Sequence, residues 1–144
     1  YHQRMVEGYR EARDMLEANR IMLEAITSSR VEGDVDEASH LIGKVVVEQG
    51  AKIVASTVRG PVIIGKRSRI INSYIGPFTS IYHDTLVQNS EIEHSIILDQ
   101  CRITDIGGRL EDSLIGKNVE VFRSDGKPRA YRLMLGDSSQ VGLV

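Results

Sequence analysis

Two histidines, His83 and His94, stand where they could serve as general bases. A neutral imidazole can take a proton from a hydroxyl or an amine while that group attacks an acyl donor, so the chemistry would be acyl transfer. Each histidine follows an aliphatic residue by two positions, at a point where the repeat described below turns an outer corner. The plainer interpretation is that both are solvated corner residues.

Three other features suggest chemistry that their own surroundings argue against. Residues 60–66 suggest a phosphate-binding loop, but Arg67 stands where such a loop needs Ser or Thr. The remaining histidines, His2 and His40, complete no zinc-binding cluster. Cys101, the one cysteine, precedes an aliphatic core position by two, which indicates a buried thiol rather than a nucleophile. We therefore expect no catalytic, cofactor-binding or metal-binding residue in this chain.

Composition narrows the class of protein further. The 144 residues hold 18 basic and 20 acidic side chains, and this near-balance argues against a nucleic-acid partner. The hydrophobic fraction of 41% supports a real core, which must be aliphatic because aromatic residues make up only 5%. No apolar run is long enough to span a bilayer and no leader opens the chain, so we expect a cytoplasmic protein without a membrane partner.

The chain divides near Ser28 into a helical segment, 1–29, and a strand-rich domain, 30–144. Apolar residues recur at helical spacing before that point and predict one amphipathic helix of about four turns. These residues are Ala12, Met15, Leu16, Met22, Leu23 and Ile26. The helix must pack against the following domain or a partner, because nothing in its own segment can cover the apolar stripe.

From residue 41 onward, aliphatic residues recur at steps of five or six and form a ladder with a period of 17. The ladder comprises Val47, Ile64, Ile81, Leu98 and Ile115. Small residues such as Ser56, Ser68 and Ser90 stand two positions before most of the aliphatic residues at these steps, and therefore share the inward face of a short strand. Gly, Asn and Pro between the rungs suit tight corners. Three strands and three corners per 17 residues predict a triangular prism of stacked parallel coils.

Residues one position before each of the aliphatic residues at these steps point outward, and two columns of them differ in character. One column is mostly basic and comprises Lys52, Arg69, Leu86 and Arg102. The other is mostly apolar and comprises Val46, Ile63, Ser80, Ile97 and, in one register, Leu114. An apolar column needs cover from the helix, another subunit or a further domain. After Leu98 the register is open, and an alternative register puts Leu114 beside Tyr74.

Near the C-terminus, alternation around Val121, a turn at 124–128 and a strand at 131–135 predict a β-hairpin. We expect this hairpin to cover the open end of the prism, whose unpaired edge would otherwise invite aggregation. Residues 106–108 are expected to form an outward loop.

The repeat resembles the hexapeptide pattern, which is clearest in IGKRSR at 64–69 and IGPFTS at 75–80. This resemblance implies a left-handed parallel β-helix. More narrowly, several motifs resemble the C-terminal part of long-form glucose-1-phosphate thymidylyltransferases, a family of sugar nucleotidyltransferases. The motifs are LEANR at 16–20, RGPVIIG at 59–65, SYIGPFTSI at 73–81, EIEHSI at 91–96, DSLIG at 112–116 and RLMLGD at 132–137.

The resemblance implies a non-catalytic domain for oligomerisation or regulation, with a trimer favoured, attached to a catalytic domain that this chain lacks. The parent reaction would join glucose 1-phosphate to dTTP and release pyrophosphate, with Mg²⁺ held by the missing domain. Two alternatives stay open. One is a hexapeptide acetyltransferase acting on an amino-sugar phosphate with His94 or His83 as base. The other is a regulatory site for a sugar nucleotide on the outer face.

Overall fold

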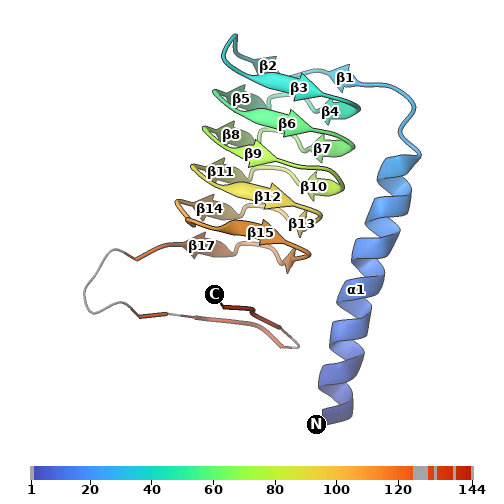
Figure 1. The fold of residues 1–144 in the computed structure, drawn as a ribbon, viewed down its shortest axis with the longest axis vertical. Helices are drawn as coiled ribbons and strands as arrows, with labels where there is room; N and C mark the ends of the chain where they lie inside the picture. The colour runs from blue at the N-terminus through green and yellow to red at the C-terminus, as the bar shows by residue number, and fades with distance from the viewer. Residues whose placement is uncertain (1, 125–129, 132, 138, 144) are drawn as a thin grey trace.

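Short strands stack in parallel into three sheets that form the sides of a prism (Figure 1). The computed structural model describes residues 2–124, 130–131, 133–137 and 139–143, with the backbone alone for 2–7 and 9. Sheet A has six strands: β1 (Arg30–Val31), β4 (Val45–Val47), β7 (Val62–Ile64), β10 (Thr79–Ile81), β13 (Ile96–Ile97) and β16 (Leu114–Ile115).

The other two sheets repeat the same arrangement. Sheet B has six strands: β2 (Asp34–Val35), β5 (Lys52–Val54), β8 (Arg69–Ile71), β11 (Leu86–Gln88), β14 (Arg102–Thr104) and β17 (Glu120–Phe122). Sheet C has five strands: β3 (His40–Ile42), β6 (Thr57–Arg59), β9 (Tyr74–Ile75), β12 (Glu91–Glu93) and β15 (Arg109–Glu111). In Figure 1 the sheet C strands run left to right in front, and the chain returns behind them while descending, so the coils are left-handed.

The core is a stack of aliphatic side chains inside the prism, as the ladder predicts. Val47, Ile64 and Ile81 are paired in register from β4 to β10 and are at most 1% exposed. The next rung is Ile97 and not Leu98, because Ile81 pairs with Ile97. The prediction of Leu98 as a rung is therefore wrong, and the outward residue of this coil is Ile96, not Ile97.

The ladder shifts by one residue at Ile97 because successive coils differ in length. Ser80 pairs with Ile96, 16 positions later, and Ile96 then pairs with Leu114, 18 positions later. The two coils together restore the average of 17, so Ile115 is again in line. Since Leu114 pairs with Ile96, the alternative register that placed it beside Tyr74 is wrong. The extra residues lie around the exposed Gly107 and Gly108, where an outward loop was predicted, although Ile106 packs against the core.

Corner residues adopt the left-handed conformation that tight turns require. These positive-φ residues outside glycine are Ala55, Arg67, Asn72, Phe78, Asp84, Asn89, His94, Gln100, Asp105, Asp112 and Asn118. Asn and Asp supply six of these eleven positions. Their short polar side chains tolerate this backbone, which explains why the corners were visible in the sequence.

Small inward residues beside the corners form hydrogen bonds between coils as well as saving space. The backbone N–H of Ser73 donates to Ser56 Oγ at 2.9 Å, and that of Ser90 donates to Ser73 Oγ at 3.2 Å. Each hydroxyl in turn donates to the carbonyl two residues before it. A second column continues through Thr85, whose backbone N–H donates to Ser68 Oγ. This hydroxyl ladder satisfies buried N–H groups where the chain leaves one sheet for the next.

The helix α1 (His2–Glu24) lies along sheet A and is longer than the predicted four turns. On this helix, the side chains of Leu16 and Leu23 are buried, with 7% and 0% exposed, whereas those of Met15 and Met22 are about half exposed. The predicted apolar stripe is therefore wider than the face that makes contact. A buried Asn19 fixes the contact: its Nδ2 donates to the Phe78 carbonyl, and its Oδ1 accepts from Ser80 Oγ at 2.6 Å.

Part of the outward column of sheet A is covered, as its apolar character predicted, although Ile63 and Leu114 in the same column are only half-buried. Val46, Ser80 and Ile96 are each no more than 9% exposed, and α1 packs against β10. No helix among the described residues is long and apolar enough to cross a membrane.

The predicted C-terminal hairpin is wrong. Glu120–Phe122 pairs in parallel with Arg102–Thr104 as a further coil strand, not antiparallel with a later strand. The described residues from 130 to 143 contain no strand, and most of the turn predicted at 124–128 falls outside the described residues. In Figure 1 the C-terminal segment passes beyond the last coil, at the end where α1 begins.

Candidate functional site

His83 is held between two carboxylates at the corner joining sheets A and B. Its Nδ1 lies 2.7 Å from Asp84 Oδ2 and its Nε2 lies 3.1 Å from Asp99 Oδ2. A general base needs one ring nitrogen that faces the substrate with its lone pair free. Both nitrogens of His83 already face carboxylates, so this residue is built into a charge network and is not arranged for catalysis.

The same corner holds a paired arginine and a strongly acidic carboxyl group. Arg67 donates two hydrogen bonds of 2.9 Å to the carboxylate of Asp84. This hydrogen bonding, with a smaller contribution from His83, lowers the pKa of Asp84 from 3.8 to about 2. Because Arg67 and Asp84 come from successive coils, the pair joins the coils at the surface.

His94 has the partner that a catalytic histidine would have, but its second nitrogen is closed off. Its Nδ1 makes a short hydrogen bond with Asp112 Oδ1, the kind of contact that orients an imidazole for proton transfer. Its Nε2 is buried and has no hydrogen-bond partner among the described residues. The ring of Phe78 packs against the imidazole ring of His94 in a T-shaped arrangement. In this conformation the nitrogen that would act as base is not open to solvent.

Cys101 is buried, as predicted. Burial raises the pKa of its thiol, and Sγ donates to the Gly116 carbonyl at 2.9 Å. It occupies the position of the next hydroxyl in the ladder, where its backbone N–H donates to Thr85 Oγ1. Among the described residues no three His, Cys, Asp or Glu side chains are grouped to hold a metal ion. Residues 62–64 of the suspected phosphate loop form strand β7, with Val62 and Ile64 fully buried.

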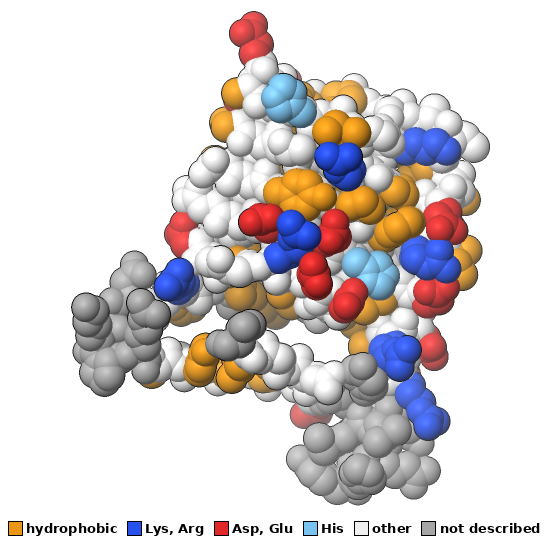
Figure 2. Space-filling model, in the orientation of Figure 1, with side chains coloured by type: hydrophobic (Ala, Val, Ile, Leu, Met, Phe, Trp, Pro, Cys, Tyr) orange, Lys and Arg blue, Asp and Glu red, His pale blue; other side chains and the backbone are white. Residues whose placement is uncertain are grey.

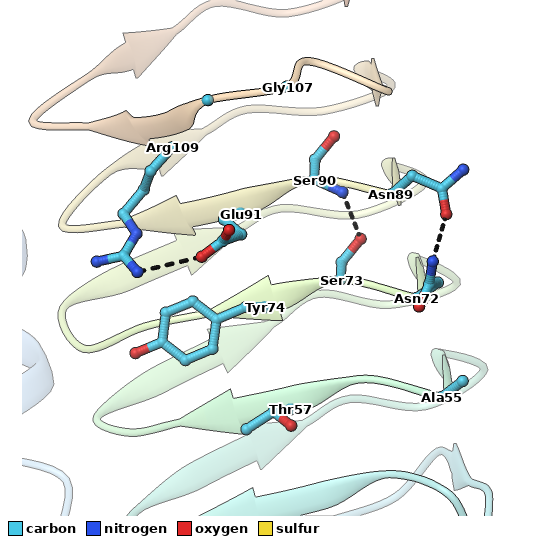
Figure 3. Close-up of a pocket in the computed structure, with 11 residues that line it drawn as sticks. Ala55, Thr57, Asn72, Ser73, Tyr74, Asn89, Ser90, Glu91, Gly107 and Arg109 are labelled. Carbon is cyan, nitrogen blue, oxygen red and sulfur yellow. Dashed lines mark hydrogen bonds and ion pairs between the residues drawn. The ribbon is translucent and has the colours of Figure 1, made fainter.

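A groove of about 550 Å³ crosses the outer face of sheet C next to its corner with sheet B (Figure 3). Its walls come from four successive coils and include Thr57, Asn72, Tyr74, Glu91 and Arg109. Sequence reasoning missed this site, because these residues come together only when coils of 17 and 18 residues are stacked. The repeat period was the signal that could have found it.

Arg109 dominates the chemistry of one side of the groove. Its guanidinium contacts Glu91 Oε1 at 3.1 Å and Glu93 Oε2 at 3.2 Å, and lies 5.3 Å from the centroid of the Tyr74 ring. Hydrogen bonding to Glu91 is the main cause that raises the pKa of Arg109. With Glu111 also 3.7 Å away, one cation faces three carboxylates, and Figure 2 shows this acidic cluster around a basic side chain.

A ladder of amide side chains lines the corner edge of the groove. Asn72 Nδ2 donates to Asn89 Oδ1 at 2.7 Å, and Asn89 Nδ2 donates to Asp105 Oδ1 at 2.7 Å. Donors point toward the C-terminal coils and acceptors toward the N-terminal coils.

A second, smaller pocket of about 330 Å³ on sheet B has the opposite charge. Arg69 and Arg102 flank Leu86 in its wall, and Lys52 continues the same column beside Arg69. Leu86 is only 5% exposed although it points outward, because the long stems of the flanking arginines can cover it. The basic column predicted from the sequence is therefore confirmed.

Comparison with known proteins identifies relatives of this chain. The chain is 50% identical over 127 residues to a glucose-1-phosphate thymidylyltransferase of Streptomyces griseus and 46% identical over 141 residues to that of Streptomyces antibioticus. These alignments cover 88% and 95% of the chain. The chain is a homologue of the C-terminal part of these thymidylyltransferases. It spans 35% and 39% of the two relatives' length.

The chain is also similar to the bifunctional protein GlmU of Methanocaldococcus jannaschii, with 36% identity over 154 aligned residues. This alignment covers 90% of the chain and 37% of GlmU. No family model matches the chain. The resemblance seen in the sequence motifs is thus confirmed for the fold and for the relationship.

Proposed function

We propose that this chain is the non-catalytic C-terminal domain of a sugar-phosphate nucleotidyltransferase, and that it assembles subunits and supports a separate catalytic domain. The parent enzyme would join glucose 1-phosphate to dTTP, giving dTDP-glucose and pyrophosphate in the cytoplasm. Its Mg²⁺ and catalytic residues would belong to the other domain. The observation that carries this proposal is the 50% identity to a glucose-1-phosphate thymidylyltransferase over 88% of the chain.

Exposed apolar residues at the end of the prism support the assembly role. Leu133, Met134 and Leu135 are 53%, 101% and 56% exposed, and they belong to the C-terminal segment that passes beyond the last coil. A contiguous apolar segment of this kind favours contact with another subunit or domain.

Light scattering of the purified chain tests the assembly proposal. We expect a trimer, with a mass three times the chain's 16.0 kDa. Replacing Leu133, Met134 and Leu135 by Ser should shift the mass toward that of one chain while the circular dichroism of the sheets stays unchanged. A monomer at all concentrations would overturn the assembly role.

The competing function is acetyl transfer, which the His94–Asp112 pair favours and the buried Nε2 of His94 opposes. Incubation with acetyl-CoA and glucosamine 1-phosphate separates the two. We expect no release of free CoA. Release that is abolished by His94→Ala, and retained in His83→Ala, would establish the acetyltransferase instead.

A regulatory sugar nucleotide remains part of the proposal, and the basic column on sheet B suits its diphosphate. Lys52 and Arg69 are direct neighbours without an ion pair among the described residues, so their mutual repulsion would be relieved by an anion. Calorimetry with dTDP-glucose should give binding that Arg69→Gln weakens and Arg109→Gln does not. Equal binding by both variants would reject this surface.

A further inference from the structure

The amide ladder along the groove on sheet C stops one step short. The corner before Asn72 is Ala55, which lines the same groove and adopts the same left-handed conformation, with φ of 48°. The following three corners of this edge are Asn72, Asn89 and Asp105, all with polar side chains. Alanine has no side-chain donor for Asn72, so Asn72 Oδ1 has no hydrogen-bond partner among the described residues.

Alanine is a costly choice at this corner. A left-handed conformation costs an ordinary L-residue roughly 1–2 kcal/mol, while Asn and Asp adopt it more easily. An asparagine would also extend the ladder by one hydrogen bond. Instead the small side chain leaves space beside Asn72 and Thr57, and Figure 3 shows both side chains lying on this side of the groove.

Uncommitted polar groups line the groove between the Ala55 coil and Arg109. They are the carbonyl oxygen of Asn72, the hydroxyl of Thr57 and the second carboxylate oxygen of Glu91, for which no partner exists among the described residues. The ring of Tyr74 supplies an apolar wall at the opposite side of the groove from Asn72, below Arg109. A few convergent polar groups beside an aromatic ring, in a groove of about 550 Å³, are typical of small-ligand sites.

Charge decides which class of ligand fits. Arg109 is surrounded by Glu91, Glu93 and Glu111, and Asp105 lies at the end of the ladder. These four carboxylates outweigh one guanidinium, so a phosphate or diphosphate would be repelled. A neutral molecule with many hydroxyl groups avoids that repulsion and can donate to the unpaired acceptors.

We propose that the groove on sheet C is a binding site for a neutral saccharide. Hydroxyl groups of a pyranose donate to Asn72 Oδ1 and Glu91, the Thr57 hydroxyl pairs with a further sugar hydroxyl, and the C–H face of the ring packs against Tyr74. This site goes beyond the proposed assembly role and does not depend on it, because one chain supplies every lining residue.

The test is a ¹H–¹⁵N NMR titration of the 144-residue chain with maltose, and separately with inorganic pyrophosphate. We expect maltose to shift the side-chain amide signals of Asn72 and Asn89 in a saturable way. Ala55→Asn should weaken maltose binding at least tenfold while raising the Tm, because it fills the groove and relieves the corner. Loss of affinity in a more stable protein cannot be attributed to unfolding.

Two further variants complete the design. Gln100→Asn places asparagine at another left-handed corner, outside the groove, and should leave maltose binding unchanged. Thr57→Val removes only the hydroxyl and should weaken binding at least threefold, which keeps the test decisive if Ala55→Asn fails to fold. The proposal is overturned by absent maltose shifts, by unchanged affinity in these groove variants, or by pyrophosphate binding as tightly at the same amides. The oligomer mass is a separate readout, so either proposal can fail alone.

Discussion

Hydroxyl groups at the corners act as structural bridges between coils. Ser73 accepts the backbone N–H of Ser90 and donates to the Ile71 carbonyl, so it completes a bond that no strand ladder supplies. Thr79, in contrast, is fully buried with no hydrogen-bond partner for Oγ1 among the described residues. The hydroxyl of Ser73 therefore stabilises the fold, whereas the unpaired hydroxyl of Thr79 destabilises it.

Ser73→Ala should destabilise the fold by about 1–3 kcal/mol, because the N–H of Ser90 loses its acceptor inside the protein. Thr79→Val, which replaces an unpaired hydroxyl by a methyl group of similar size, should leave stability unchanged or increase it. Urea unfolding of the three proteins measures the difference. Equal destabilisation by both substitutions would show that the ladder contributes only by its size.

At the scale of elements, α1 covers an apolar sheet face through a narrow line of contacts. Leu23 is completely buried, while its neighbour Met22 is 50% exposed. Asn19 adds a buried polar contact that fixes the helix in register with β10 through Ser80. The helix therefore depends on a few side chains, and its N-terminal half extends beyond the last coil (Figure 1).

Leu23→Ala should cost about 2–5 kcal/mol where the helix meets the sheet, because a buried side chain leaves a cavity. Hydrogen exchange should accelerate in α1 and leave the strands of sheet C protected. Met22→Ala is the matched control and should change neither. If Leu23→Ala instead exposes all three sheets together, α1 and the prism unfold as one unit.

The sequence predicted the prism well because its signal is periodic, and it failed where periodicity is ambiguous. Three aliphatic residues, Ile96, Ile97 and Leu98, follow one another, so any of them satisfies an average spacing. Only the backbone pairing of Ser80 with Ile96 shows that this coil is short. The first half of α1 carried no apolar period and was therefore missed.

The candidate site was predicted less well than the fold. His83 and His94 were found at the corners as expected, but the contacts that occupy or bury their nitrogens come from other coils. The groove residues Tyr74 and Arg109 are 35 positions apart in the chain. Their proximity depends on one coil of 17 and one of 18 residues, a sum that constant spacing does not give.

At the scale of the whole molecule, ion pairs between coils make stability depend on pH. Asp84 ionises with a pKa of about 2 when folded, below its ordinary 3.8, so folding favours its charged form. Its contribution is fully present above about pH 4 and is lost as the pH falls toward 2. Arg67, which donates both hydrogen bonds, remains charged throughout.

Asp84→Asn should therefore flatten the acid limb of the stability profile. The free energy of unfolding of the unaltered chain should fall more steeply between pH 4 and pH 2 than that of the variant. Asparagine keeps the shape and suits the left-handed corner, so the comparison isolates the charge. Parallel profiles for the two proteins would contradict the assigned role of the Arg67–Asp84 pair.

The short coil followed by a long one has a consequence for how such a domain tolerates insertions and deletions. A deletion displaces every later rung by one position and would turn the remaining aliphatic side chains outward. Here a gain of one residue in the next turn cancels the error, and the displacement is confined to a single layer. A shortened coil can therefore persist when the next coil is lengthened by the same amount, much as a second frameshift restores a reading frame.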